Sequence, residues 1–359
     1  MSHNFISIII PTYNEKENIH KLIERLSTVF SGKNYEIIIV DDNSKDGTIE
    51  VVNNLKSLFS VNLLVREKEK GLATAVLHGI TYAKGDIISI MDADLQHPPE
   101  VSIELLKALD QGADLAIASR YIAGGKCLKW GIFRRINSKF ALSLSHIFLP
   151  KTREIKDPMT GYFMFRRDKI KGVILKPIGY KILLELIVMG KFDNIVEIPF
   201  TFEERYGGVS KLRFSQQIDY LKHVMSLVKR SGELLRILKF VLVGASGVIV
   251  NLSILWFLTT YLKVPYYISA IISIESSIIS NFLLNNYFTF SDRRSPEHGT
   301  FMQKMFKFNL NCLIGALIQY SIMIILTTIF KIHYLISSMV GIASAFIWNY
   351  LLSSIWIWK

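Results

Sequence analysis

Residues 87–96, with the sequence IISIMDADLQ, place two carboxylates directly after a short apolar run that is typical of a buried strand. In an extended chain, residues two apart point to the same side, so Asp92, Asp94 and Gln96 are expected to converge. Three such oxygen ligands suit a hard cation, Mg²⁺ or Mn²⁺. A bare Asp-x-Asp can also be two solvated acids in a turn, and the rest of the sequence has to separate these interpretations.

The first part of the chain alternates apolar runs with helical patterns. Strands are predicted at residues 5–10, 37–40, 61–65, 86–91 and 115–119, with helices between them. This order favours an α/β fold with a mostly parallel, Rossmann-like sheet, in which ligands bind beyond the carboxyl ends of the strands. The polar clusters at 11–15, 41–44 and 92–97 should therefore share one rim. No Gly-x-Gly-x-x-Gly or P-loop pattern is present, so dinucleotide and ATPase functions lose their main support.

Bulk composition points to a partner that carries negative charge. The chain has 359 residues, 50% of them hydrophobic, and a net charge of +12. Nucleic acid, anionic lipid and a phosphorylated substrate are all compatible with this charge. We expect no nucleic-acid partner, because the sequence has no zinc finger, RNA-binding signature or Arg-rich tail. Two cysteines predict no disulfide framework, and the absence of a signal peptide predicts a cytoplasmic first half.

The second part of the chain is strongly apolar. Residues 214–238 are amphipathic, which is typical of a core helix or of a helix on a membrane surface, and we favour the membrane surface. Four apolar segments follow, and each is long enough to cross a bilayer. They span about 240–262, 266–290, 306–330 and 334–357. The excess of Lys and Arg in 291–305 and before the first span places both termini in the cytoplasm.

Six separated motifs occur in order along the first part of the chain. They are PTYNE (11–15), Asp41-Asp42, DADLQHP (92–98), Ser119-Arg120-Tyr121, DPMTGY (157–162) and RYGGVSK (205–211). Over residues 1–235 this order resembles the polyprenyl-phosphate glycosyltransferases of the GT-A type, family 2, and most closely those of the dolichyl-phosphate mannose synthase kind. The four spans resemble a GtrA-like membrane domain in layout. The resemblance implies a GT-A domain at 1–212, interface helices at 213–238 and a four-helix membrane domain at 239–359.

The resemblance also implies roles for individual residues. Asp92, Asp94 and Gln96 match the metal-binding residues, and Arg120 and Arg134 match those that hold the acceptor phosphate. The donor nucleotide sugar would be bound by Pro11, Tyr13, Glu15, Asp42, Asp92, Ala93, Asp94, Gln96, Arg205 and Lys211. The catalytic group would be Asp92, Asp94, Arg120 and Arg134.

Some roles have alternatives. Arg135 could take the place of Arg134, and Glu15 could be a first-turn helix acid. Asp41 could cap its turn while Asp42 faces the nucleotide. Asp157 is expected to organise a loop, although it is the best candidate if a base exists. His97 could be only a turn residue.

An acceptor phosphate is already ionised near neutral pH, so it needs positioning more than a base. We therefore expect an inverting, metal-dependent transfer of one sugar to a polyprenyl phosphate, with mannose from GDP-mannose and dolichyl phosphate as first choice. UDP-glucose is the alternative donor. A lipid flippase or transporter with a nucleotide-sensing domain is a competing interpretation, supported by Glu275 inside the second span. The oligomeric state is left open.

Overall fold

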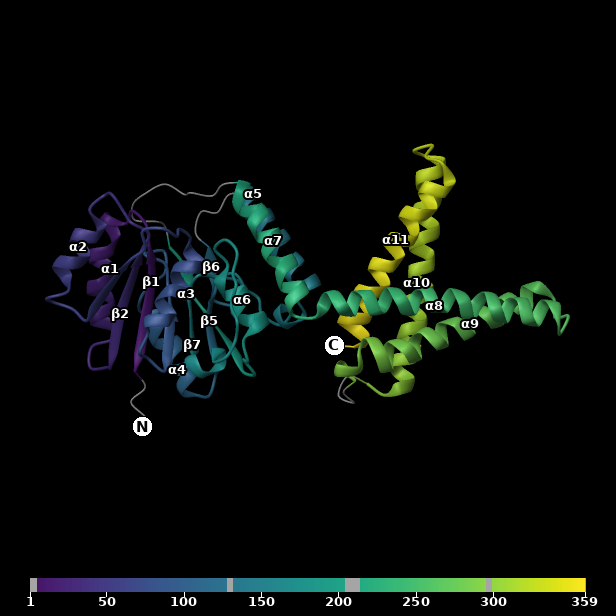
Figure 1. Ribbon diagram of the computed structural model, residues 1–359, viewed down its shortest axis with the longest axis horizontal. Coiled ribbons are helices and arrows are strands. Elements are labelled where there is room, and N and C mark those ends of the chain that lie inside the picture. The colour runs from purple at the N-terminus through teal and green to yellow at the C-terminus, as the bar shows by residue number, and fades with distance from the viewer. Residues whose placement is uncertain (1–4, 128–131, 204–213, 295–298, 359) are drawn as a thin grey trace. The chain divides into compact units, whose positions relative to one another are not determined.

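The computed structural model describes residues 5–127, 132–203, 214–294 and 299–358. The chain forms two compact units, which meet in sequence between Ser231 and Gly232. The first unit is a sheet covered by helices, and the second consists of long helices (Figure 1).

The first unit is built on a seven-stranded sheet in the order β3-β2-β1-β4-β7-β5-β8. All five strands predicted from sequence are present. They are β1 (Ile6–Thr12), β2 (Tyr35–Asp41), β3 (Val61–Val65), β4 (Ile87–Ile90) and β5 (Leu115–Ser119). Two further strands join them, β7 (Phe163–Arg166) and β8 (Ile195–Pro199). The sheet is mostly parallel, as expected, but β7 is antiparallel to both of its neighbours, β4 and β5. A small second sheet pairs β6 (Lys126–Cys127) with β9 (Thr201–Phe202).

Helices cover both faces of the large sheet, which explains why its central strands are apolar on both sides. One buried core joins the sheet to α1 (Lys16–Val29), α2 (Thr48–Leu55) and α4 (Val101–Asp110). A second core, on the other face, joins it to α3 (Leu72–Tyr82) and α6 (Ile182–Met189). The unit also contains α5 (Ile132–Phe148), α7 (Phe214–Arg230) and two short 3-10 helices, η1 (Pro150–Thr152) and η2 (Arg167–Ile170).

The amphipathic stretch expected at 214–238 is divided in two. Helix α7 ends at Arg230, and Gly232, with φ of 84°, precedes a new helix that begins at Glu233. One face of α7 is buried against α6, where His223 and Arg230 both bind the buried carboxylate of Glu185. Its other face leaves apolar side chains exposed, namely Ile218, Leu221 and Met225. Among the described residues, the helix therefore combines a core face with an apolar face that is largely exposed.

In its described residues, the second unit contains four helices long and apolar enough to span a membrane. They are α8 (Glu233–Thr260), α9 (Tyr266–Leu284), α10 (Phe301–Thr328) and α11 (Tyr334–Leu352). Short turns complete them: η3 (Asn285–Thr289), η4 (Ser291–Arg293) and η6 (Ser353–Ile357). The four spans predicted from composition are thus present, with α8 beginning earlier in the chain than expected. The protein is an integral membrane protein.

The second pair of spanning helices repeats the first. Helices α8 and α10 both have 28 residues, α9 and α11 both have 19, and each pair ends in a five-residue π-helical turn. The starting residues of matching elements differ by one constant offset: 233 and 301, 266 and 334, 285 and 353. The same offset relates Phe290 to Trp358, whose rings stack on each other at 4.7 Å and 3°. The membrane unit is therefore an internal duplication.

Candidate active site

The predicted rim exists at the carboxyl ends of β1, β2 and β4. Thr12, the last residue of β1, lies in register with Asp41, the last residue of β2. The loops that follow are tied together, because the backbone N–H of Asn14 donates to Ser44 Oγ at 2.8 Å and that of Glu15 donates to Thr48 Oγ1 at 3.0 Å. Residues 11–15 and 41–48 therefore form one wall of the rim.

Of the predicted donor-binding residues in this wall, Pro11 is buried and Tyr13 is 40% exposed. The ammonium group of Lys70 lies over the Tyr13 ring, 5.2 Å from its centre. Glu15 precedes α1, and its Oε2 accepts a hydrogen bond from Asn18 Nδ2 at 2.6 Å. Glu15 therefore lies just before the helix, and the acid in the first turn of α1 is Glu17.

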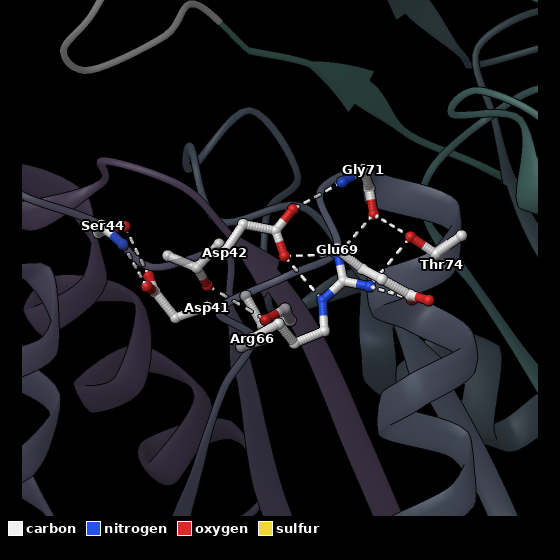
Figure 2. A network of polar contacts seen from close by, with 9 residues as sticks. Asp41, Asp42, Ser44, Arg66, Glu69, Gly71 and Thr74 are labelled. Atoms are coloured by element: carbon white, nitrogen blue, oxygen red, sulfur yellow. Dashed lines mark hydrogen bonds and ion pairs between the residues drawn. The ribbon is translucent and has the colours of Figure 1, made fainter.

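Asp41 and Asp42 have different partners (Figure 2). The carboxylate of Asp41 accepts two hydrogen bonds from Ser44, one from its N–H and one from its hydroxyl, both at 2.7 Å. Burial raises the pKa of Asp41, although these two bonds oppose that rise. Asp41 therefore organises the turn, which leaves Asp42 as the carboxylate at the rim.

Asp42 is held by Arg66, the residue that follows β3. Arg66 Nε and Nη2 donate to Asp42 Oδ1 at 2.7 and 2.5 Å, and the N–H of Gly71 donates to Asp42 Oδ2 at 2.7 Å. Arg66 also binds the Thr74 hydroxyl and the Gly71 carbonyl (Figure 2). Both side chains of the ion pair are buried, so the position of the Asp42 carboxylate is fixed from two sides.

The segment predicted to bind a metal, residues 92–96, departs from the extended geometry assumed from sequence. Strand β4 ends at Ile90, before Asp92, and Leu95 has a φ of 61°. The chain therefore turns between Asp94 and Gln96, and the two-residue alternation of a strand does not apply there. Gln96 is fixed instead by the residue that follows β9, because its Nε2 donates to the carbonyl of Glu203 at 3.0 Å.

Two neighbours shape the position of Asp92. His97 is buried among Tyr162, Phe200 and Phe202, and its Nδ1 accepts the N–H of Asp92 at 3.2 Å. Burial lowers the pKa of His97 to about 4, so the ring is neutral at pH 7. His97 is therefore more than the turn residue considered from sequence.

Gly161 lies against the Asp92 carboxylate. A Cβ added at Gly161 would lie 2.9 and 3.0 Å from its two oxygens, closer than van der Waals contact allows. A glycine is thus required for the DPMTGY loop to pass this close to the carboxylate.

The side chains of Asp92, Asp94 and Gln96 carry oxygen donors of the kind that a hard divalent cation prefers. Asp92 and Asp94 supply carboxylates, and Gln96 supplies an amide oxygen because its nitrogen is engaged with Glu203. Within the described residues, no three His, Cys, Asp or Glu side chains gather closely enough to hold a metal alone. Two carboxylates completed by an amide and by substrate phosphate oxygens are a usual arrangement for Mg²⁺.

Arg120 follows β5 and is bound by Asp157. Its Nε and Nη2 donate to the two carboxylate oxygens at 2.7 Å each. Burial alone would lower the pKa of Arg120, but its hydrogen bonds with Asp157 and the charge of that carboxylate outweigh burial and raise the pKa. The ring of Phe202 lies under the guanidinium, 5.5 Å away. Asp157 therefore positions Arg120, as expected of a loop-organising residue.

The other predicted cations are only partly described. Arg134 and Arg135 belong to α5, and their side chains lie outside the described part of the structure. Arg205 and Lys211 lie outside the described residues.

Sequence reasoning missed Arg66, the contact of Gly161 with Asp92 and the aromatic surroundings of His97. Arg66 could have been found, because it follows a predicted strand at the same rim. Gly161 lies in the DPMTGY motif, but its contact with Asp92 and the surroundings of His97 depend on distant segments.

Comparison with known proteins agrees with the division of the chain into a sheet-based first unit and a unit of spanning helices. The pattern of the family "Glycosyl transferase family 2" matches residues 7–173, and that of "GtrA/DPMS, transmembrane domain" matches residues 239–358. A dolichol-phosphate mannosyltransferase of Pyrococcus furiosus is 45% identical over 95% of this chain and 96% of its own length. The chain belongs to the family 2 glycosyltransferases.

Other relatives match a smaller share of this glycosyltransferase. A dolichol-phosphate mannosyltransferase of Saccharomyces cerevisiae is 38% identical over 62% of the chain and 86% of its own length. Among solved structures, glucosyl-3-phosphoglycerate synthase from Mycobacterium tuberculosis matches with a TM-score of 0.51 and 18% identity, covering 64% of this chain and 80% of that one. At that identity the likeness shows the shared fold alone.

Proposed function

We propose that this glycosyltransferase transfers one mannose from GDP-mannose to a polyprenyl phosphate, such as dolichyl phosphate, with inversion at the anomeric carbon. The observation that carries the proposal is the 45% identity with the Pyrococcus furiosus mannosyltransferase, which extends across both the rim and the spanning helices. The rim supports it, because it brings carboxylates and arginines to the carboxyl ends of the strands, where such folds bind ligands.

The donor would lie along the wall formed by residues 11–15 and Asp42, with its diphosphate toward Asp92, Asp94 and Gln96. These three would hold Mg²⁺ or Mn²⁺, whose charge offsets that of the leaving diphosphate. Structures of the Mycobacterium tuberculosis synthase with the same fold contain Mn²⁺ or Mg²⁺ together with UDP. Arg205 and Lys211 are proposed to bind the same diphosphate, so that negative charge is stabilised as it develops.

The acceptor would be positioned by Arg120 and Arg134. A phosphate oxygen attacks the anomeric carbon, the bond from that carbon to the diphosphate oxygen breaks, and GDP leaves with the electron pair. The phosphate is already ionised, so no side chain has to remove a proton. This fits the position of Asp157, whose carboxylate is occupied by Arg120 and is a poor candidate for a base.

We further propose that this chemistry takes place on the cytoplasmic face. The cations of the membrane unit gather at the end where α8 and α10 begin, namely Arg236, Lys239, Arg293, Arg294, Lys304 and Lys307. The opposite loops carry Lys263 and Lys331. The positive-inside rule assigns the richer end, and with it both termini and the first unit, to the cytoplasm.

The test is transfer in membranes that contain the full chain and polyprenyl phosphate, with labelled GDP-mannose, UDP-glucose and UDP-N-acetylglucosamine compared in parallel. We expect glycolipid from GDP-mannose only. If glycolipid formed only from UDP-glucose, the donor would be UDP-glucose and not GDP-mannose. If none of the three donors gave a product, the assignment as an enzyme would be refuted. The wild type should lose activity in EDTA and regain it when Mn²⁺ is added. Asp94→Asn should be inactive. Full activity of the wild type in EDTA would refute the metal dependence.

The flippase alternative depends on Glu275, an exposed carboxylate on α9 that accepts a hydrogen bond from Asn309 on α10 at 2.6 Å. If Asp94→Asn abolished glycolipid formation while lipid translocation continued, and Glu275→Gln stopped translocation, the flippase would be the better description.

A further inference from the structure

One carboxylate of the membrane unit is exposed on the outside of the spanning helices. Glu275 of α9 is exposed, and its Oε1 accepts a hydrogen bond from Nδ2 of Asn309, on α10, at 2.6 Å. Among the described residues, Asn309 is the only side chain that bonds to this carboxylate. In the described part of the unit, the Oε2 atom of Glu275 and the second N–H of Asn309 therefore have no partner.

The pair lies at a depth that neither water nor lipid headgroups reach. Glu275 is the tenth residue of the continuous helical stretch Tyr266–Thr289. At 1.5 Å per residue it lies about 14 Å from one end of that stretch and about 21 Å from the other. The hydrocarbon core is about 30 Å thick, so the side chain cannot extend to either boundary. Carboxylates inside spanning segments almost always face the interior of a helix bundle, because lipid tails cannot bond them. The exposure of Glu275 therefore indicates that a further polar group covers it.

The internal duplication supplies a comparison for this pair. Its constant offset relates Glu275 to Ala343 and Asn309 to Val241, and both of these equivalents are apolar and exposed. Lipid tails can cover an alanine and a valine, whereas they leave a carboxylate and an amide without hydrogen bonds. The polar pair therefore distinguishes one of two equivalent sides of the membrane unit.

We propose that this side of the membrane unit binds a second copy of the chain. Copies inserted in the same direction are related by a two-fold axis along the membrane normal, so residues of equal depth meet. The second N–H of Asn309 donates to Oε2 of Glu275 in the other copy, and the reverse bond forms at the same time. Hydrogen bonds of this kind hold spanning helices together. Because only one of the two equivalent sides carries the pair, the assembly closes at two copies, and it does not depend on the transfer reaction.

Association of the full chain in liposomes tests this contact. Protein labelled at its N-terminus is diluted into increasing amounts of lipid, and the fraction of dimers is counted by single-molecule photobleaching. Glu275→Leu and Asn309→Leu should each raise the dissociation constant about tenfold, because each substitution removes both symmetric hydrogen bonds. The matched controls are Ala343→Leu and Val241→Leu at the equivalent positions, which should change the constant about twofold or less.

Two further variants separate the contact from a folding defect. The exchange of Glu275→Asn together with Asn309→Glu keeps one donor and one acceptor on each copy, so it should restore association. Glu275→Gln keeps an oxygen acceptor and should associate as the wild type does, since the contact needs a hydrogen bond and not a charge. If both of these variants dissociated as the leucine variants do, the proposal would be overturned.

Disulfide crosslinking locates the interface. Ile271 precedes Glu275 by about one helical turn, its equivalent in the repeat is Met339, and the side chains of Ile271 and Met339 are both 70% exposed. Oxidation in liposomes should link Ile271→Cys into dimers and leave Met339→Cys monomeric, with the wild type as the baseline for Cys127 and Cys312. Monomers at every dilution, or equal crosslinking at the two positions, would overturn the proposal. A crosslink to a protein of another mass in native membranes would overturn the second copy as the occupant and assign this side to a different membrane protein.

Discussion

Both carboxylate oxygens of Asp157 bind the guanidinium of Arg120, and the backbone N–H of Arg120 donates to the same carboxylate at 3.0 Å. Three hydrogen bonds from one residue to another leave Arg120 a single orientation at the end of β5. The side chain that is proposed to hold the acceptor phosphate is therefore set in place before the acceptor binds.

Asp157→Asn should loosen that orientation. We expect the KM for polyprenyl phosphate to rise about tenfold, equivalent to one charge-assisted hydrogen bond, while the KM for GDP-mannose stays within about twofold. The control is Asp168→Asn, at an exposed position in η2. If kcat fell instead by a factor of about 100 or more and the acid limb of the pH profile disappeared, Asp157 would be a general base.

Arg66→Met should impair the donor site and the fold together. It leaves the buried Asp42 carboxylate without its ion-pair partner, which costs about 3–5 kcal/mol in similar cases. We expect a lower Tm and weaker GDP binding by calorimetry.

The matched control for Arg66 is Arg25→Met, because Arg25 also makes two hydrogen bonds to one carboxylate, that of Glu100, but on the surface. Its loss should cost no more than about 1 kcal/mol. Equal effects of the two variants would show that the Asp42–Arg66 pair has no special role.

Gly161→Ala should change the position of the Asp92 carboxylate while leaving the carboxylate itself in place. The new Cβ would push the carboxylate away, so we expect activity to fall at least about tenfold and the Mn²⁺ concentration for half-maximal activity to rise. Gly244→Ala introduces the same methyl group into open space on α8 and should leave both quantities unchanged. Wild-type metal dependence in Gly161→Ala would contradict a role for this close approach.

His97 should make the protein less stable in mild acid. Its pKa is lowered from 6.5 to about 4 by burial, so unfolding takes up a proton between these values. Stability is unaffected above pH 6.5 and falls as the pH drops toward 4, by up to about 3 kcal/mol. His97→Phe keeps a ring but cannot titrate, so its Tm should fall less between pH 7 and pH 5. His20→Gln, at an exposed site, should follow the wild type.

The strands and the spanning helices could be predicted because their signals are local. Apolar runs ending in polar clusters predicted β1 to β5 and the shared rim, and length with composition predicted the four spans. Strand β7 has only four residues, and nothing in them indicates that they insert antiparallel between β4 and β5. The turn at Leu95 was missed because the strand pattern was extended past Ile90, where the pairing stops.

The internal repeat had a sequence signal that could have been found. Lys239 and Lys307, Phe240 and Phe308, and Lys263 and Lys331 are identical pairs at the constant offset. The strongly apolar composition hides this signal, because apolar residues match one another at many offsets. Lys263 and Lys331 also share a left-handed backbone, with φ of 54° and 55°, so the repeat extends to the loop conformation.

The stacking of Phe290 on Trp358 has a consequence for how the membrane unit arose. Phe290 and Trp358 occupy equivalent positions in the two hairpins and stack on each other. Phe282 and Tyr350 are also equivalent to each other. Phe282 contacts Trp358 and Tyr350 contacts Phe290, so these two contacts are related by the same exchange of hairpins. This is the geometry of an isologous interface, in which one surface is complementary to itself. The joint between the hairpins thus has the form of a homodimer contact enclosed in a single polypeptide. Fusion of two copies of an ancestral helical hairpin would preserve such a contact and then free each half to diverge.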